Sequence, residues 1–209
     1  PASFAGAVYF PRGPVTVGQW QAPSAIYQDI SMTHTDSPKP VSASAVHNHV
    51  YKVFPNDLNA HYTVFGGLVM SLCDRVALVV SERHSGKVCV TASVDSFHFK
   101  APAKDGDTLL ISAAVNRTWS SSMEIGVRVE AENSFSGEVK HIVSAYFTFV
   151  ALGPDNKPCN VPEIDPQTDA ELRRYQGAQI LALGSDPFAN RNGEAPLLRE
   201  RLTGRKRPG

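Results

Sequence analysis

The chain has 209 residues, with 20 basic and 20 acidic side chains, so its formal net charge is zero. This balance gives no support for a nucleic acid or an acidic surface as a partner. No stretch reaches the roughly 18 to 20 apolar residues that a membrane span needs. A hydrophobic fraction of 42% suffices for a sizeable core, and the length fits one domain with extensions or two small domains.

The first 45 residues are rich in Pro, Gly, Ser and Ala and poor in acids. This composition predicts an irregular N-terminal extension, which could be a linker, a processed leader or a surface arm. The chain starts at Pro1 and not at Met, so the natural N-terminus is expected to be missing.

The predicted elements begin with a strand over His47–Phe54 and a loop rich in Asn and Asp. The long apolar segment Gly66–His84 predicts a helix, which Ser85 and Gly86 end. In the segment Met123–Glu132 apolar and polar residues alternate, which is typical of a half-buried antiparallel strand. Four strands are predicted after the helix: Val88–Lys100, Thr108–Asn116, Met123–Glu132 and Val139–Leu152.

The order of one strand, one helix and then a run of strands favours an α+β fold, with the helix packed on an antiparallel sheet. This domain is predicted over residues 46–155. Residues 156–209 are predicted to hold a Pro-rich connector, a C-terminal helix through Leu183 and a basic tail. Thr168 and Glu171 form the capping box that opens this helix. The basic tail is interpreted as a solvated terminus in preference to a nucleic-acid or localisation signal.

The three cysteines have neither a CxxC motif nor metal-ligand spacing. Cys73 and Cys89 lie in apolar segments and are expected to pack as small hydrophobic residues. An odd number of such thiols favours a reducing compartment. We therefore expect a cytoplasmic or mitochondrial protein that is not secreted, without a metal site.

One segment, Asn56–Asp74, combines a loop, a Gly-Gly pair and a single acid on the predicted helix. Between Gly66 and Glu82 the charged residues are Asp74 and Arg75, and nearly all others are apolar. A helix that is apolar on all sides is usually buried. A buried carboxylate is costly unless it is compensated or used, so Asp74 is interpreted either as a structural acid with a partner or as a catalytic group.

Three segments, PNDLNAHYTVFGGLVMSLCD, ERHSGKVCVTASVDSFHF and VNRTWSSSMEIGVRVEAEN, carry a resemblance to a known family. They resemble the hotdog-fold acyl-CoA thioesterases, especially the eukaryotic cytosolic and brain-type hydrolases and their bacterial relatives. The resemblance covers roughly residues 46–183. It implies a curved antiparallel sheet wrapped around one long helix, the hydrolysis of fatty acyl-CoA to a free acid and CoA, and homodimers assembled as trimers of dimers.

The resemblance also implies the catalytic pair. In members of this family, catalysis is attributed to an asparagine in the loop before the helix and to an acid on the helix. These positions fall on Asn59 and Asp74, which are 15 residues apart as in the family. Some bacterial relatives carry Asp where this chain has Thr63, and Thr is common in members that keep the helix acid. Tyr62 stands where relatives often have Gly, so a narrowed or reshaped loop is expected.

A mechanism follows from the residues at the helix start. Gly66 and Gly67 begin the helix, where backbone N–H groups are unpaired and carry partial positive charge. We expect the Gly67 amide to polarise the thioester oxygen, Asp74 to act as general base or nucleophile, and Asn59 to hold the water or the carbonyl. Asp74 lies about 12 Å beyond Gly66 along the helix axis. The site is therefore predicted to be shared across an isologous dimer, which contains it twice.

Basic and hydroxyl side chains are the candidates for binding CoA. Arginine suits phosphate recognition, and lysines and serine hydroxyls can support it. The residues predicted to bind substrate are Thr63, Phe65, Lys100, Lys104, Arg117, Ser120, Ser121 and Ser122. Coenzyme A is part of the substrate, and no other cofactor is expected.

Two other functions compete with hydrolysis. A hotdog protein could bind acyl-CoA as a sensor or partner without turning it over. Another hotdog reaction, such as enoyl hydration, would be expected to need an Asp paired with a His, and the sequence shows no such pair. The absence of a GxSxG motif disfavours a serine hydrolase of the α/β type.

Overall fold

The computed structural model describes residues 37–185. The predicted N-terminal extension up to residue 36, and the predicted basic tail from residue 186, lie outside this range. The first described segment, β1 (Lys39–Pro40), pairs in parallel with β7 (Ile164–Asp165), and a short 3-10 helix, η1 (Val41–Ala43), follows it. The stretch before residue 46, predicted to be irregular, is therefore tied to the domain from Lys39 onwards.

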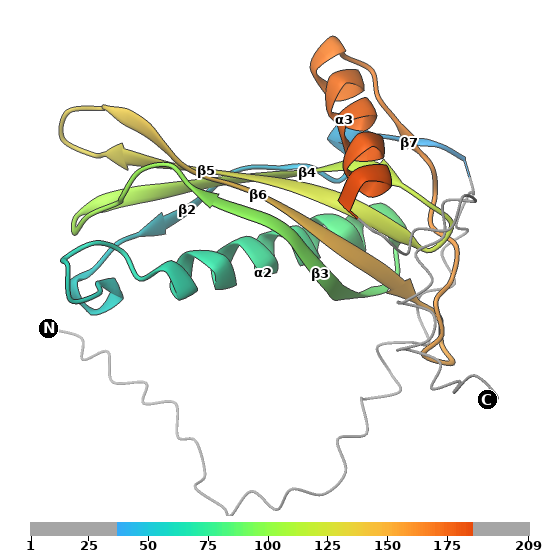
Figure 1. The fold of residues 1–209 in the computed structure, drawn as a ribbon, viewed down its shortest axis with the longest axis horizontal. Coiled ribbons are helices and arrows are strands. Elements are labelled where there is room, and N and C mark those ends of the chain that lie inside the picture. Colours follow the sequence, from blue (N-terminus) through green and yellow to red (C-terminus); the bar gives the residue numbers. More distant parts are fainter. Residues whose placement is uncertain (1–36, 186–209) are drawn as a thin grey trace, which may run out of the picture. The chain divides into compact units, whose positions relative to one another are not determined.

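The domain is built on one five-stranded antiparallel sheet with the strand order β2-β4-β5-β6-β3 (Figure 1). The second 3-10 helix, η2 (Pro55–Asp57), opens the loop between β2 and α2. Each predicted strand is present, with ends that differ from the prediction by at most two residues. The strands are β2 (Val46–Lys52), β3 (Val88–Phe99), β4 (Asp107–Thr118), β5 (Ser122–Asn133) and β6 (Val139–Leu152).

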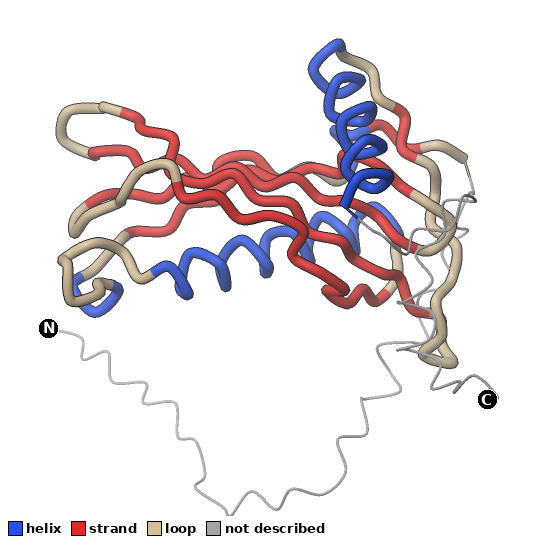
Figure 2. The backbone as a smooth tube through the Cα atoms, viewed as in Figure 1, coloured by secondary structure: helices blue, strands red, loops and turns tan. Residues whose placement is uncertain are grey.

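The central helix α2 (Gly66–Ser85) runs along one face of the sheet, and α3 (Asp169–Ser185) stands on the other face (Figures 1 and 2). Gly86 ends α2 with a φ of 66°, a left-handed conformation that glycine adopts without a steric penalty. Neither helix is long and apolar enough to cross a membrane.

The core lies between α2 and the helix-facing side of the sheet. Alternate residues of β4, β5 and β6 are buried on that side, as the period of two in Met123–Glu132 predicts. One stripe of α2 packs against them, and this stripe consists of Val69, Leu72, Cys73, Val76, Ala77 and Val80. The other stripe of α2 is exposed in the single chain. The apolar composition of the helix predicted burial on all sides, and this prediction is wrong for that stripe.

Polar contacts fasten the C-terminal connector to the end of α2. His84 is fully buried, and its Nε2 lies 2.9 Å from the carbonyl oxygen of Pro162. The Lys39 Nζ donates to the His84 carbonyl at 2.7 Å. Burial lowers the pKa of His84, which keeps the imidazole neutral at this position.

The predicted capping box of the C-terminal helix is confirmed. The Glu171 amide donates to Thr168 Oγ1 at 3.3 Å, and the Thr168 amide donates to Glu171 Oε2 at 3.0 Å. The two reciprocal bonds satisfy backbone donors at the start of α3 and fix where the helix begins.

Candidate active site

A pocket of about 420 Å³ opens beside the first turn of α2. Its polar lining comes from Asn59 and Thr63 of the preceding loop and from Lys100, and Gly66 forms part of its wall. The structure therefore brings four of the predicted site residues together. Apolar side chains, including Val69, Phe99 and Ile142, complete the lining and can contact an acyl chain or a pantetheine arm.

Asn59 organises the loop that leads into this pocket. Its Oδ1 accepts from the His61 amide at 2.8 Å, and its Nδ2 donates to Thr63 Oγ1 at 2.9 Å. These are the local bonds by which Asn side chains stabilise turns. Tyr62, inside the same loop, has a φ of 57° and is 81% exposed. Glycine adopts this left-handed conformation without the steric cost that a side chain such as that of Tyr62 carries.

The two glycines at the start of α2 allow close approach to the backbone. The amides of Leu68 and Val69 donate to the Phe65 carbonyl, whereas those of Gly66 and Gly67 lie one step earlier, where an α-helix offers no acceptor. A Cβ at Gly67 would lie 2.5 Å from the Phe65 ring, and one at Gly66 would lie 3.2 Å from the Phe99 ring. A side chain at either position would therefore displace one of these two exposed rings.

Asp74 lies on the exposed stripe of α2 and is half-buried, which corrects the prediction of a buried carboxylate. The expectation failed because the apolar residues around Asp74 divide between the core stripe and an uncovered surface. The Asp74 Oδ1 accepts a 2.6 Å hydrogen bond from Thr91 Oγ1 of the edge strand β3. The carboxylate is thus held at the seam between helix and sheet.

Sequence reasoning missed Thr91, although it lies within one of the motifs quoted above. Its strand partner Phe149 is fully buried, so Thr91 faces the helix side of the sheet. Its neighbours on that side of β3, Cys89 and Val94, are apolar. A single hydroxyl in an apolar row is a signal that could have identified Thr91 once the strand register was known.

Two of the predicted CoA contacts, Arg117 and the Ser120–Ser122 turn, do not line this pocket within one chain, whereas Lys104 bridges to Thr63 at its edge. Arg117 lies beneath α3, where its guanidinium is 4.3 Å from the ring of Tyr175 and donates to the Tyr175 carbonyl. The Ser120–Ser122 turn lies near the C-terminal end of α2, opposite the pocket. Ser122 pairs with Val150 of β6, and Val150 also pairs with Val90, near the start of β3, which follows directly after α2.

Comparisons with known proteins identify the family. Residues 61–134 match the family model of the thioesterase superfamily. The uncharacterized acyl-CoA thioester hydrolase YkhA of Bacillus subtilis is 38% identical, over 61% of this chain and 74% of that protein. An apo hexameric acyl-CoA thioesterase of known structure is 36% identical, with a TM-score of 0.68, over 69% of this chain and 92% of that one. This chain belongs to the hotdog-fold acyl-CoA thioesterase family.

A second solved thioesterase allows the site residues to be compared. The acyl-CoA hydrolase of Staphylococcus aureus, solved with butyryl-CoA and CoA, is 37% identical, with a TM-score of 0.65, over 68% of this chain and 87% of that one. It was also solved with alanine replacing an Asp, an Asn 15 positions before it, and a Thr 17 positions after it. In this chain Asn59 and Thr91 have the same spacings from Asp74.

Proposed function

We propose that this thioesterase hydrolyses fatty acyl-CoA to a free acid and CoA, with Asp74 as the reacting carboxylate. The observation that carries the proposal is the hydrogen bond between Thr91 and Asp74. It fixes the carboxylate of Asp74 on α2. Asn59 and Thr91 share their spacing from Asp74 with residues replaced in the Staphylococcus aureus enzyme.

The chemistry needs a base, an activated water and stabilisation of the oxyanion. The Thr91 hydroxyl occupies one carboxylate oxygen of Asp74, and the other oxygen accepts the proton of a water molecule. The water oxygen attacks the thioester carbon, the C–S bond breaks, and the proton passes to the leaving thiolate of CoA. Direct attack by Asp74, through an anhydride that water then hydrolyses, is the alternative role of the same group.

The Gly67 amide is proposed as the oxyanion donor. Amides in the first turn of a helix point along the axis out of its N-terminal end and carry partial positive charge, which stabilises negative charge that develops on a carbonyl oxygen. The missing side chains of Gly66 and Gly67 leave room for that oxygen beside the rings of Phe65 and Phe99. Asn59 is proposed to position the water or the carbonyl from the pocket wall.

A two-fold axis brings the two halves of this site together. Within one chain, Gly66 and Asp74 are about 12 Å apart along α2. Thr91 and Phe99 face the helix side of the edge strand β3 at equal distances in sequence from Asp95. If β3 pairs antiparallel with its copy about an axis near Asp95, Thr91 lies opposite the partner subunit's Phe99. Because Phe99 rests on Gly66 of its own chain, the carboxylate of one subunit then meets the helix start of the other.

The surface around this axis is suited to an interface. The apolar side chains of Met70, Val79 and Val94 are each between 40% and 44% exposed in the single chain. Exposed apolar surface beside an unpaired strand edge favours association with another chain. We propose a homodimer, further assembled as a trimer of dimers, in line with the hexameric thioesterase of known structure.

The reaction as proposed uses water and the chain's own residues, without a metal or a cofactor. An intracellular location, cytoplasmic or mitochondrial, is proposed as well. It is supported by the free thiols of Cys73, Cys89 and Cys159, which suit a reducing compartment.

A turnover assay tests the proposal. Purified full-length protein is given a panel of acyl-CoAs, and the released thiol is measured with a chromogenic thiol reagent. Asp74→Ala should lower kcat by about 10²- to 10⁴-fold, the usual contribution of a general base, while CoA binding persists. Wild-type protein that binds acyl-CoA without releasing CoA would instead be a non-catalytic acyl-CoA sensor.

A further inference from the structure

The loop that leads into α2 folds into a short antiparallel ladder. At one end the Asn59 amide donates to the Thr63 carbonyl, and at the other end the Phe65 amide donates to the Asp57 carbonyl, both at 2.8 Å. An antiparallel bridge lies between these two bonds. Asn59 is therefore at the tip of the ladder, and Gly66 follows directly at its base. The asparagine and the helix start proposed to act on the thioester belong to one hydrogen-bonded unit.

Asp57 holds the base of this ladder against β2. Its Oδ1 accepts from the Tyr51 hydroxyl of β2 at 3.0 Å, and its Oδ2 accepts from the Phe54 amide at 2.9 Å. Its own amide donates to the Phe54 carbonyl at 2.9 Å. Together with the bond from Phe65, these contacts join β2, η2 and the start of α2 through a single residue. Because both carboxylate oxygens accept hydrogen bonds, the side chain has one favoured orientation.

The bond between Asp57 and Phe65 sets the direction of the helix start. Phe65 is the N-cap residue of α2, and its amide is taken up by the Asp57 carbonyl. The next two amides, of Gly66 and Gly67, have no acceptor within an α-helix and are the donors that can face a substrate. A shift of Asp57 moves the Phe65 peptide, and the two glycine amides turn with it.

We propose that Asp57 is a positioning residue for thioester hydrolysis and that Tyr51 holds it in place. Asp57 keeps the Phe65 peptide oriented so that the Gly67 amide points at the developing oxyanion, and it keeps Asn59 at the pocket through the same ladder. This inference rests on the proposed role of the Gly67 amide. Asp57 does not line the pocket, so it acts through the backbone and not by contact with the substrate. A misplacement of reacting groups by about 1 Å can cost about 10²-fold in rate.

Steady-state kinetics of full-length variants on one acyl-CoA tests the proposal. Asp57→Ala removes both side-chain bonds, and kcat should fall about 10- to 100-fold while KM changes less than about threefold, because the oxyanion forms only in the transition state. Asp57→Asn should recover most of kcat, because its oxygen can accept from the Phe54 amide and its NH₂ group can donate to the Tyr51 hydroxyl. Tyr51→Phe should lower kcat by itself and cause no further fall when combined with Asp57→Ala.

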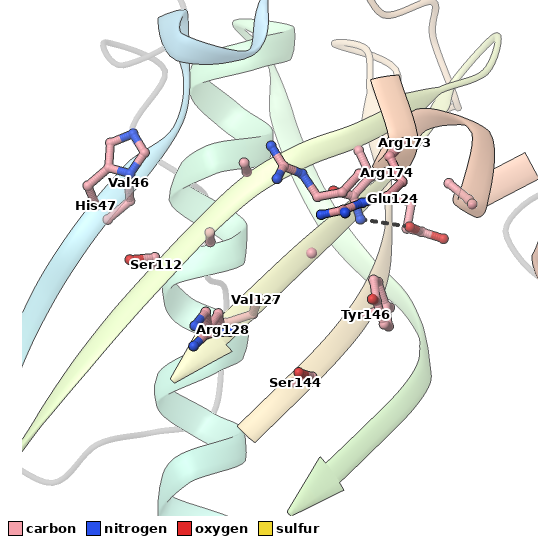
Figure 3. Close-up of a pocket in the computed structure, with 16 residues that line it drawn as sticks. Val46, His47, Ser112, Glu124, Val127, Arg128, Ser144, Tyr146, Arg173 and Arg174 are labelled. Atoms are coloured by element: carbon pink, nitrogen blue, oxygen red, sulfur yellow. Dashed lines mark hydrogen bonds between the residues drawn. The ribbon is translucent and has the colours of Figure 1, made fainter. Parts of the chain in front are cut away.

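The matched control is an acid on the other face of the sheet. Glu124 accepts a 2.9 Å hydrogen bond from Asn116 and lines a hollow of about 710 Å³, which shares no residue with the pocket beside α2 (Figure 3). Glu124→Ala also removes a carboxylate that accepts a hydrogen bond, but kcat should change less than about twofold because the two sites are independent. Thermal unfolding establishes that each variant is folded before its kinetics are compared.

Hydrogen–deuterium exchange provides a readout that does not depend on turnover. The peptide that contains Phe65 and both glycines should exchange faster in Asp57→Ala than in wild type, and at the wild-type rate in Asp57→Asn. The proposal is overturned by unchanged exchange or wild-type kcat in Asp57→Ala, by no recovery in Asp57→Asn, or by an equal loss of kcat in Glu124→Ala. Wild-type protein that releases no CoA overturns the proposed function instead, and the exchange comparison then still decides whether Asp57 holds the helix start.

Discussion

The hydroxyl of Thr91 donates a 2.6 Å hydrogen bond to Asp74 and so joins the edge strand of the sheet to the central helix. Residues 17 positions apart in sequence thereby form one unit. Hydrogen bonds to charged groups are typically worth about 1.5–3 kcal/mol, enough to decide which rotamer the carboxylate adopts. Thr91 is therefore proposed to position the reacting group.

The first prediction concerns that bond. Thr91→Val keeps the shape of the side chain and removes the donor, so kcat should fall about 10- to 100-fold, in line with the loss of one charge-assisted bond. Thr91→Ser retains a hydroxyl and should recover most of the activity. Steady-state kinetics of both variants on one acyl-CoA is the measurement, and equal activity of Thr91→Val and wild type would contradict a positioning role.

The second prediction tests whether the site is shared between subunits. Asn59→Ala and Asp74→Ala should each be inactive as homo-oligomers. When the two chains are co-expressed with different tags, a mixed dimer has both substitutions in one site and none in the other. Random pairing should therefore restore about a quarter of wild-type activity. Recovery of no activity in purified mixed dimers would place each complete site within one chain.

The third prediction concerns acyl specificity. The ring of Phe99 covers Gly66 at the pocket and packs against Phe97 in a tilted arrangement, with 4.9 Å between the ring centres. Phe99→Leu should open this end of the pocket and move the preference toward longer or bulkier acyl groups, by about tenfold in relative kcat/KM, because each buried methylene contributes about 0.8 kcal/mol. Phe135→Ala, at a 96% exposed position, is the matched control and should leave the chain-length profile unchanged.

The fourth prediction follows from a buried acid. Burial raises the pKa of Glu124 above its ordinary value of 4.5, although the hydrogen bond from Asn116 opposes this. The folded protein then holds this proton more tightly than the unfolded chain, so the free energy of unfolding falls as pH rises from about 4.5 through the folded pKa. Glu124→Gln keeps an acceptor for Asn116 without the ionisation. Its Tm should exceed that of wild type near pH 8, and the difference should shrink toward pH 4 in a thermal unfolding series.

The local elements were predictable from sequence because local patterns decide them. Alternation in Met123–Glu132, the apolar run from Gly66 and the capping box at Thr168 each reflect a period or a hydrogen bond within a few residues. The resemblance to a known family related Asn59 to Asp74, because their separation is the one found in that family. The sequence by itself therefore determined the α+β architecture and the candidate catalytic pair.

Three features depended on the tertiary structure. Thr91 became a candidate only when the register of β3 placed it opposite Phe149 and beside the helix. Arg117, predicted to bind CoA, contacts α3, because the fold brings Tyr175 against it from 58 residues away. Asp74 proved half-exposed because packing decides which stripe of an apolar helix is covered. Such contacts join residues that are distant in the chain, and no local period of the sequence specifies them.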